Sequence, residues 1–383
     1  MKKKNILVFM NSFWNDGKGI SGGDQMFIQI FKRIQNKINQ IFLYTNRDGE
    51  KIIKSNKINK IKFFISNQRY DKFTLILNYL LRTYAALSCL GLTNIDIIYS
   101  TSDFFPDVFP AFLYKFFHKK GKWIQYIFHI YPNWYQRPGN KLRNLTAQFF
   151  QQLSLIFIKK ADCIVNINTY VKQYLCKKGF DPNKIIINTP GINYSYLNNL
   201  KLSNMEQAYD GVFLSRLMPS KGIFDLIKIW KEVVVLKPNL KLAIIGGGSN
   251  TIMKALMLQI QNQNLQNNIY ILGYLNDNTS FIIVKKSKVF LFPSHEEGFG
   301  IAIAEAMVCQ TPVIAWHLPI YDEIFENNMV KVEENNITTF SAIIIKLIDN
   351  IELRKNISKK AHKFIKKYDW NKVALKQLKL LDG

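Results

Sequence analysis

Short apolar runs alternate along the first half of the chain with stretches in which apolar residues recur every three to four positions. The short runs predict buried strands over residues 4–10, 41–45, 61–65, 95–100, 123–128 and 163–167. The stretch from Gly23 to about Lys37 predicts a helix, because its apolar residues fall on one face. Strands that alternate with helices form parallel sheets with crossover helices, so we expect that architecture here.

The same pattern restarts after residue 208. Strands are predicted over 210–215, 242–245, 289–292 and 313–315, with helices over 221–236 and 301–309. The polar stretch between the halves contains Pro190, Gly191 and many Asn and Ser residues, which is typical of a linker. We therefore expect two doubly wound α/β domains at 1–190 and 209–360, a linker at 191–208, and a C-terminal helix at 361–383 that crosses back to the first domain.

The chain has 383 residues and a formal net charge of +25. Such a charge favours polyanionic partners, namely nucleic acid, an anionic membrane or phosphorylated substrates. Lys, Asn and Ile are abundant throughout, so a general compositional bias explains the charge equally well. We find no zinc-finger, RNP-type or basic-zipper pattern and expect no nucleic-acid partner.

The cysteines and the apolar segments bear on location. The four cysteines are Cys89, Cys163, Cys176 and Cys309. None forms a CxxC pair and each lies among apolar residues, which favours reduced, buried thiols in a cytosolic protein. The apolar run at 6–10 is too short for a signal peptide and predicts a first strand instead. No stretch reaches the length of a transmembrane helix, so we expect a cytoplasmic protein.

Ligands of open α/β sheets bind beyond the carboxyl ends of the strands, so the loops that follow strands carry the candidate chemistry. Gly22 and Gly23 open the first helix, where free backbone N–H groups can hold an anion, although a tight turn explains paired glycines equally well. Gly247 lies in a glycine run after the strand at 242–245. There the backbone can approach a nucleotide closely, and a flexible turn is the alternative.

Two cations follow the strand at 210–215. Arg216 ends the strand and Lys221 begins the next helix. Together they suit a diphosphate, because Arg makes forked hydrogen bonds and Lys acts as a mobile point charge. Composition alone favours the alternative, which is two solvated surface cations.

The segment from Pro293 to Met307 carries the strongest signal. Glu297 lies in the loop before a glycine-rich helix start, and Glu305 lies eight residues further on, near the same face of the helix. The two carboxylates can accept hydrogen bonds from sugar and ribose hydroxyls. A lone buried carboxylate is costly, so a salt bridge to a structural Lys or Arg is the alternative for Glu305. The backbone N–H groups that can take a phosphate or sugar oxygen are those of Gly298, Phe299, Gly300 and Ile301.

These residues resemble glycosyltransferase family 4, the large family of retaining enzymes with the GT-B fold. Glu297 and Glu305 match its E-x7-E motif in the setting EGFGIAIAEAM, between FLFPS and TPVIA. Arg216 and Lys221 match the family's strand-end Arg and helix-start Lys, and SGGDQMF resembles its N-terminal GGxE segment. The resemblance covers nearly the whole chain and is most specific over residues 209–325. It implies two Rossmann-like domains that face each other across a cleft.

The resemblance also implies the chemistry. Arg216 and Lys221 would neutralise the donor diphosphate, Glu305 would bind the ribose, and Glu297 would contact the transferred sugar. His129, which follows the strand at 123–128, matches the family's N-domain histidine near the reacting sugar, although a lone His at a strand end is more often structural. The donor would be a UDP- or GDP-sugar, with no metal or other cofactor. Transfer of a hexose-type sugar with retention is expected, with electrostatic stabilisation of the departing diphosphate as the main catalytic effect.

The chain departs from the family pattern in three places. Asp24 stands in the GGxE-like segment where a small residue is more common, and Gln310 replaces the Gly that usually precedes TPV. The sugar loop contains Trp316 and His317 in place of the usual glycines. These departures bear on the identity of the sugar rather than on the reaction class, and we expect Trp316 and His317 to shape the sugar site.

The family resemblance places the acceptor in the N-terminal domain. Residues 73–92 are rich in Leu, Ile and Tyr around Arg82, and residues 113–122 mix cations with aromatic residues. Basic-aromatic mixtures suit an anionic membrane face, and a buried helix with a solvated basic turn is the alternative. We expect a peripheral enzyme at the inner face of the membrane that extends a glycan or polyprenyl-diphosphate-linked acceptor in surface polysaccharide biosynthesis. The second segment contains Tyr114, Lys115, Phe116, Phe117, Lys119, Lys120 and Lys122.

Two other functions stay open. A nucleotide-sugar epimerase of GT-B fold would bind the same donor without an acceptor, and the presence of Lys221 beside the Glu297 and Glu305 motif argues against it. A non-catalytic polyanion-binding protein would ignore nucleotide sugars and bind with a steep salt dependence.

Overall fold

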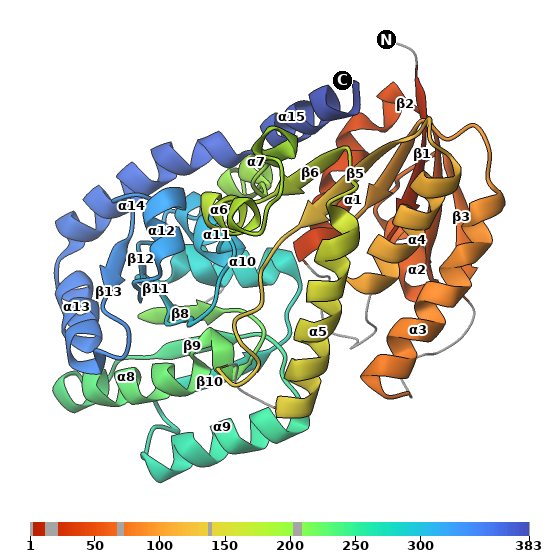
Figure 1. Ribbon diagram of the computed structural model, residues 1–383. Helices are drawn as coiled ribbons and strands as arrows, with labels where there is room; N and C mark the ends of the chain where they lie inside the picture. Colours follow the sequence, from red (N-terminus) through yellow and green to blue (C-terminus); the bar gives the residue numbers. More distant parts are fainter. Residues whose placement is uncertain (1–2, 12–21, 67–72, 137–139, 202–208, 383) are drawn as a thin grey trace. The chain divides into compact units, whose positions relative to one another are not determined.

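The computed structural model describes residues 3–11, 22–66, 73–136, 140–201 and 209–382. Helices and strands alternate along these ranges (Figure 1). The chain divides into two compact units: unit 1 comprises residues 1–190 with 370–383, and unit 2 comprises residues 191–369. Most of the expected glycine loop before Gly22 and residues 202–208 of the expected linker lie outside the described ranges.

Unit 1 is built on a parallel sheet of seven strands in the order β3-β2-β1-β4-β5-β6-β7. β1 is a central strand: Leu7 lies opposite Phe42 on one side and opposite Ile98 on the other. The prediction that the first apolar run is a buried strand is therefore confirmed. The strands are β1 (Lys4–Phe9), β2 (Ile38–Asn46), β3 (Ile61–Ser66), β4 (Ile97–Ser100), β5 (Lys122–Ile127), β6 (Cys163–Asn166) and β7 (Ile185–Ile187).

The helices of unit 1 begin at polar residues that cap them. The side chains of Asn46, Thr74, Asn140 and Asn168 each accept a hydrogen bond from the backbone N–H three residues on. α3, α4 and α5 pack against one another, while α15 at the end of the chain packs on α1. The helices are α1 (Gly22–Ile34), α2 (Arg47–Ser55), α3 (Leu75–Ala86), α4 (Phe105–Phe117), α5 (Lys141–Ile158), α6 (Thr169–Lys177) and α15 (Trp370–Asp382).

Unit 2 contains a second parallel sheet, of six strands in the order β10-β9-β8-β11-β12-β13. Trp230 and Trp316 are fully buried in the core of unit 2. Its strands are β8 (Gly211–Leu214), β9 (Leu242–Ile245), β10 (Ile269–Gly273), β11 (Val289–Phe292), β12 (Val313–Trp316) and β13 (Val330–Val332). Its helices are α7 (Tyr194–Asn198), α8 (Ile223–Leu236), α9 (Asn250–Asn262), α10 (Asp277–Lys286), α11 (Ile301–Val308), α12 (Pro319–Ile324), α13 (Ile337–Asp349) and α14 (Ile351–Ile365).

Three strands were not predicted from the sequence. β7, β10 and β13 all lie at an edge of their sheets. Edge strands pair on one side only, and β10 buries only its first residue fully although its sequence IYILG is largely apolar. The expected linker is also partly folded: Ile192 pairs with Asp369, and α7 packs on α11 within unit 2. The C-terminal helical segment divides at Asp369, so α14 belongs to unit 2 and α15 to unit 1.

In both sheets the strand order reverses near the middle. The reversal lies between β1 and β4 in unit 1 and between β8 and β11 in unit 2. The loops on either side of such a point leave the sheet in opposite directions and open a crevice for ligands. The loops after these four strands are therefore where functional residues are expected.

Candidate functional site

Three loops meet at the carboxyl edge of the sheet in unit 2. They follow β9, β8 and β11, which are neighbours in the sheet. The backbone N–H of Leu217 donates to the carbonyl of Gly247 at 2.9 Å, which joins the first loop to the second. Gly246 has a φ of +147°, and a Cβ there would lie 1.7 Å from the carbonyl oxygen of Ser215. Only glycine allows these two loops to pack so closely.

A second glycine joins the β8 loop to the β11 loop. Gly222 has a φ of +70°, and a Cβ there would lie 1.6 Å from the carbonyl oxygen of Pro293. The backbone N–H of His295 donates to the carbonyl of Ser220 at 2.9 Å, and the Ser294 hydroxyl lies 3.2 Å from the same oxygen. The residues on both sides of the strand-order reversal are thus held in contact by the backbone.

Lys221 and Glu297 form an ion pair across this junction. The Nζ of Lys221 lies 2.6 Å from Oε1 of Glu297 and 2.9 Å from the carbonyl oxygen of Glu296. The side chains of Lys221 and Glu297 are only 16% and 13% exposed, so water screens the pair weakly. The alternative of a solvated surface cation therefore does not apply to Lys221.

Arg216 differs from Lys221 in its surroundings. Its side chain is exposed, and within the described part of the chain its guanidinium makes no hydrogen bond or ion pair. Because Lys221 is neutralised by Glu297, Arg216 supplies the positive charge that is free to meet an anion in these loops.

Glu305 lies on α11 with its side chain half-buried. Among the described residues its carboxyl has no hydrogen-bond or ion-pair partner. Burial raises the pKa of Glu305 to about 8, and the negative charge of Asp277 contributes to the increase. The structural salt bridge considered as an alternative is therefore absent from the described residues. A carboxyl in this state can both donate and accept hydrogen bonds near neutral pH.

The first turn of α11 is open at its backbone. Gly300 precedes it with a φ of +90°, and no side chain caps the helix. The ring of Phe299 is buried and packs on Phe325 and Tyr368, with ring centroids 5.9 and 5.2 Å apart. Of the expected donor-binding residues, Phe299 can therefore offer only its backbone, while Gly298 and Ile301 are half-buried.

His295 is a residue of this site that the sequence did not single out. Its Nε2 lies 2.7 Å from Oδ2 of Asp225 in the first turn of α8, and its Nδ1 contacts Oε1 of Glu334. The hydrogen bond to Asp225, followed by the one to Glu334, raises the pKa of His295, and the same contact lowers the pKa of Asp225. His295 therefore ties the loop that carries Glu297 to α8.

In unit 1 the loops after β4 and β5 meet the start of α1. A Cβ at Gly23 would lie 2.7 Å from the ring of Phe128 and 3.0 Å from the carbonyl oxygen of Thr101, so Gly23 is required for close packing. Gly22 is exposed and has open space beside it. Of the two expected glycines, Gly23 is therefore fixed by the packing of α1, whereas a side chain at Gly22 would meet no neighbour.

The backbone around His129 is clamped from α5 by Gln151. The Nε2 of Gln151 donates to the carbonyl of His129 and to Oδ2 of Asp103, both at 2.7 Å, and its Oε1 accepts from the N–H of Tyr131 at 2.9 Å. Burial raises the pKa of Asp103, and the Gln151 hydrogen bond opposes that increase. Nothing in the sequence marked Gln151, because its role depends on contacts between α5 and two distant loops.

The structure shows where two of the departures from the family pattern lie, namely the sugar loop and Gln310. Trp316 was expected to shape the sugar site, but its ring is fully buried at the end of β12 and packs edge-on against Phe340, 4.8 Å away. That expectation is wrong for Trp316, because β12 is covered on both faces and all four of its side chains are buried. His317 is exposed and lies 2.8 Å from Asp322. Gln310 has a φ of +60°, the left-handed conformation that glycine adopts most easily.

The segments expected to face a membrane are only partly exposed. Arg82 is buried and donates to the carbonyl of Asn11 at 2.6 Å. Lys115 pairs with Asp162 at 2.8 Å, and Lys122 donates to the carbonyl of Leu380 at 3.0 Å. Tyr114 is buried. These four residues therefore stabilise unit 1, and the exposed members of the two segments are considered below. No helix in the described ranges is both long enough and apolar enough to span a bilayer.

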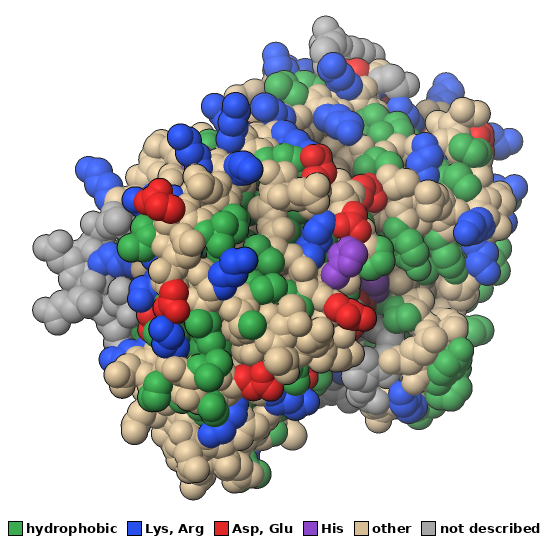
Figure 2. Space-filling model, turned by 90° about the vertical axis from the view of Figure 1, so that its left-hand side faces the viewer, with side chains coloured by type: hydrophobic (Ala, Val, Ile, Leu, Met, Phe, Trp, Pro, Cys, Tyr) green, Lys and Arg blue, Asp and Glu red, His purple; other side chains and the backbone are tan. Residues whose placement is uncertain are grey.

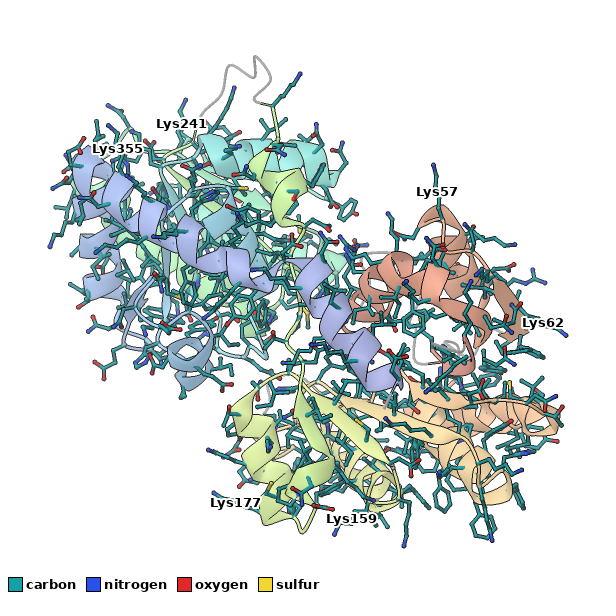
Figure 3. The ribbon with its side chains drawn as sticks, turned by 90° about the horizontal axis from the view of Figure 1, so that it is seen from above. Lys57, Lys62, Lys159, Lys177, Lys241 and Lys355 are labelled. Carbon is teal, nitrogen blue, oxygen red and sulfur yellow. The ribbon has the colours of Figure 1, made fainter. Side chains whose placement is uncertain are left out.

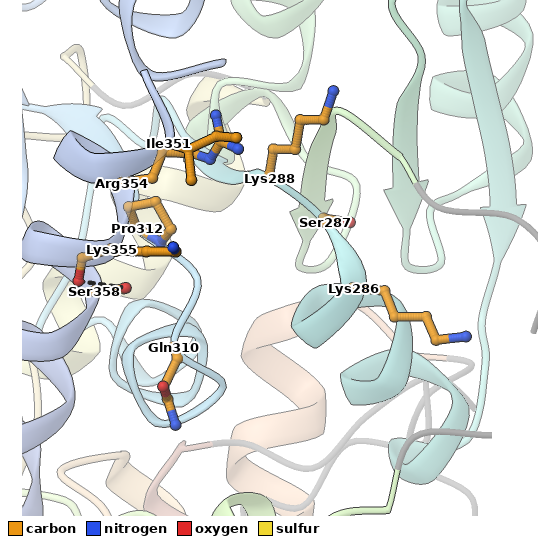
Figure 4. Close-up of a pocket in the computed structure, with 9 residues that line it drawn as sticks. All are labelled: Lys286, Ser287, Lys288, Gln310, Pro312, Ile351, Arg354, Lys355 and Ser358. Carbon is orange, nitrogen blue, oxygen red and sulfur yellow. Dashed lines mark hydrogen bonds between the residues drawn. The ribbon is translucent and has the colours of Figure 1, made fainter. Parts of the chain in front are cut away.

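A hollow of about 280 Å³ lies elsewhere in unit 2 (Figure 4). It is bordered by the residues that precede β11 and β12, so it lies at the amino edge of the sheet, opposite the three loops. Lys288 pairs with Asp210 at 2.7 Å and Lys355 with Glu352 at 3.2 Å. Two of the cations that line the hollow, Lys288 and Lys355, are thus paired with carboxylates of the protein. The lining residues are Lys286, Ser287, Lys288, Gln310, Pro312, Ile351, Arg354, Lys355 and Ser358.

Residues 201–364 match the family model described as glycosyl transferases group 1. This segment is thus similar to the glycosyl transferases group 1. The chain is 29% identical over 221 residues to an uncharacterized glycosyltransferase of Methanocaldococcus jannaschii, covering 56% of this chain and 58% of that protein. It is 31% identical over 271 residues to the poly(ribitol-phosphate) alpha-N-acetylglucosaminyltransferase of Staphylococcus aureus, covering 64% of this chain and 54% of that protein. The chain thus spans little more than half the length of either relative.

The fold has close counterparts among solved structures. The chain matches Anabaena HepE, solved in complex with UDP and glucose, with a TM-score of 0.77, 17% identity and coverage of 99% of both chains. At that identity the likeness concerns the fold alone. Together with the two parallel sheets, it shows that the protein has the GT-B fold.

Proposed function

We propose that the protein is a retaining glycosyltransferase that moves a hexose-type sugar from a nucleoside-diphosphate sugar to a glycan or lipid-linked acceptor. One observation supports it above the others. At the strand-order reversal of unit 2, an exposed Arg216 and the Lys221–Glu297 pair lie in loops that glycines hold together, and α11, which follows the β11 loop, carries Glu305, whose carboxyl has no partner among the described residues.

The donor diphosphate has a natural place in this proposal. Arg216 would meet it with its unpaired guanidinium, and the backbone N–H groups of residues 299–301, at the uncapped start of α11, would donate hydrogen bonds to an oxygen atom. Lys221 would divide its charge between the diphosphate and Glu297. As the glycosidic bond breaks, these fixed donors would stabilise the charge that grows on the leaving group.

Glu305 would bind the ribose of the nucleotide. Its carboxyl has no protein partner in the described residues, so two ribose hydroxyls would fill hydrogen-bonding capacity that the fold leaves unused. Hydroxyl donors stabilise the ionised form, so binding should lower the pKa of Glu305 from about 8 and release protons at neutral pH. Glu297 would contact the sugar, and His129 of unit 1 would lie near the reacting carbon.

The relatives guide the choice of substrates. The HepE complex holds UDP and glucose, so UDP and its sugars come first among donors and GDP-sugars second. The Staphylococcus enzyme is named for a poly(ribitol-phosphate) acceptor, and another relative is the O-antigen chain mannosyltransferase RfbU of Salmonella typhimurium. We therefore place the activity in surface polysaccharide biosynthesis, at the inner face of the membrane.

Thermal unfolding against a panel of nucleoside diphosphates tests the donor site. A ligand at about 100 times its dissociation constant adds roughly 2.7 kcal/mol to the free energy of unfolding. We expect a shift with one base, and its loss in Glu305→Gln. The matched control is Glu352→Gln, which changes an exposed carboxylate on α14 and should keep the shift. No shift with any nucleotide in folded protein would contradict the proposal.

Product analysis separates transfer from the alternatives. We expect nucleoside diphosphate to be released only when an acceptor is present, with the anomeric configuration of the donor kept in the product. A new nucleotide sugar formed without an acceptor would instead indicate an epimerase. Tight, salt-sensitive binding of polyanions without any nucleotide effect would indicate a binding protein.

A further inference from the structure

Unit 1 exposes a large apolar surface on two helices that pack together. On α3 the exposed side chains include Ile76, Leu80 and Tyr84, which are 51%, 49% and 76% exposed and recur every four residues along one side. Phe73 and Leu77 extend the same side at 47% and 42% exposed. The opposite side of α3 packs inward, since Tyr79 contacts Phe150 of α5 with ring centroids 4.8 Å apart. The buried side of α3 also carries the polar residues Asn78, Arg82 and Thr83, so the large aliphatic side chains of this helix lie mainly on its solvent side.

α5 also exposes large apolar side chains along one of its sides. Leu142, Leu145, Phe149 and Ile156 fall on one side of the helix and are 72%, 44%, 61% and 63% exposed. α4, which contacts both helices, ends in Phe116 and Phe117, which are 64% and 63% exposed. We call these exposed residues of α3, α4 and α5 the α3–α5 face. It holds 11 of the 23 large apolar side chains that are strongly exposed in the described part of the protein.

Compositional bias does not explain this surface. The chain contains 52 Lys and Arg residues, and Lys and Arg side chains are spread over the face shown in Figure 2. The exposed side of α3 carries no charge, because its one cation, Arg82, is buried. A sequence rich in lysine that keeps lysine off one solvent-facing helix has a specific apolar surface there, and such patches mark interaction sites.

Among the described residues, cations outnumber acids at the ends of the three helices of the α3–α5 face, and the exposed Asp162 after α5 is paired with Lys115. Neither α3 nor α5 contains an Asp or Glu, and the acid of α4, Asp107, is buried. Lys159, at the end of α5, points outward from unit 1 in Figure 3. The exposed cations at the ends of these helices are Lys119, Lys120, Lys141, Arg143, Lys159 and Lys160.

We propose that the α3–α5 face docks on an anionic lipid bilayer. The apolar side chains would enter the boundary between headgroups and acyl chains, while the bordering cations would bind lipid phosphates. A second copy of the chain fits less well, because a symmetric dimer on this face would bring two sets of the same cations together. The proposal extends the proposed function by naming the surface that would bring the enzyme to a lipid-linked acceptor.

Vesicle sedimentation with the full chain tests this proposal. We expect binding to vesicles that contain phosphatidylglycerol, weaker binding to pure phosphatidylcholine vesicles, and loss of binding as salt is raised. The double variant Leu80→Asp/Phe149→Asp should weaken binding roughly tenfold or more, since each change removes a large apolar group from the contact. Lys119→Glu/Lys160→Glu should weaken binding to the anionic vesicles about fivefold or more per cation, with little effect on neutral ones.

The matched control makes the same chemical change outside the face. Leu236 on α8 and Met257 on α9 are 67% and 56% exposed in unit 2, and Leu236→Asp/Met257→Asp should bind vesicles like the parent protein. Equal loss in both double variants would overturn the proposal, as would absence of binding by the parent protein at low salt. A dimer in solution that the face variant converts to monomer would assign the face to self-association and overturn it as well.

Nucleotide binding keeps the two proposals apart. All variants should retain the nucleoside-diphosphate shift, because the α3–α5 face lies in unit 1 and the donor loops in unit 2. If vesicle binding fails while the nucleotide shift persists, the docking proposal is wrong and the proposed function stands. If the nucleotide shift is absent while vesicle binding persists, the proposed function is wrong and the docking proposal stands.

Discussion

At the scale of single residues, the candidate site depends on side chains that the fold leaves without protein partners. Arg216 and Glu305 carry opposite potential charges, yet neither forms an ion pair among the described residues. A desolvated carboxyl costs free energy in the folded protein, so Glu305 reduces stability unless a ligand compensates it. Stability and ligand binding therefore place opposite demands on this residue.

The pH dependence of stability should reveal this conflict. The pKa of Glu305 is raised in the folded protein to about 8, so its contribution lowers the free energy of unfolding progressively as pH rises from about 4.5 to 8. Glu305→Gln removes that penalty. We expect the variant to melt at a higher temperature than the parent protein at pH 8.5 and at nearly the same temperature at pH 4.5. Calorimetry at both values measures the difference.

Glu352→Gln again serves as the control, because Glu352 is exposed and its substitution should be neutral at both pH values. An equal melting temperature of Glu305→Gln and parent protein at pH 8.5 would show that the Glu305 carboxyl is solvated or paired.

At the scale of elements, glycine conformations decide how the loops pack, and one helix end lacks its glycine. α11 ends in backbone bonds from Gln310 to Met307 and from Thr311 to Ala306, the pattern of a left-handed helix end. Gln310 takes that conformation with a φ of +60° although it has a Cβ. Such a conformation costs a residue with a side chain about 1 kcal/mol or more.

Gln310→Gly should therefore raise the free energy of unfolding of unit 2 by roughly 0.5–1 kcal/mol. This gain is smaller than the strain energy that the change releases, because glycine also increases the conformational entropy of the unfolded chain. Urea unfolding should show a higher midpoint with an unchanged slope. Gln261→Gly provides the contrast, since Gln261 lies inside α9 and the change should cost up to about 1 kcal/mol there. A lower midpoint for Gln310→Gly would refute the strain argument.

At the scale of the whole molecule, the C-terminal helix α15 belongs to the same unit as the N-terminal half of the chain. α15 packs on α1, and Gln377 is fully buried within unit 1. The Oε1 of Gln377 accepts hydrogen bonds from the hydroxyl of Tyr126 and from Nδ2 of Asn188, the latter at 3.1 Å. β5 and the segment after β7 are thus fastened to a helix that lies 251 and 189 residues further along the chain, respectively.

Gln377→Leu should destabilise unit 1 by about 1–3 kcal/mol, because it leaves two buried polar groups without an acceptor. Hydrogen exchange should become faster in β5 and α15 and stay unchanged in β8 and β11. The nucleoside-diphosphate shift should persist. Lys379→Ala, on the exposed side of α15, should change little. Equal acceleration in both units would mean that they unfold as one.

The sequence alone determined the alternation of strands and helices and the loops where chemistry could lie. The period of apolar residues is a local property, so the central strands β1, β8, β9 and β11 could be predicted. The motif with Glu297 and Glu305 could also be found, because its members lie on one short segment of loop and helix.

Only the tertiary structure decided which charges are paired. Lys221 and Glu297 are 76 residues apart, and Gln151 clamps loops from two other strands; no local pattern encodes such contacts. The same holds for exposure: α3 contains both apolar and polar residues, and the burial of Arg82 beside the exposure of Leu80 follows only from what packs against the helix. Periodicity reports the faces of an element, whereas pairing and exposure depend on its neighbours, which the chain brings together from a distance.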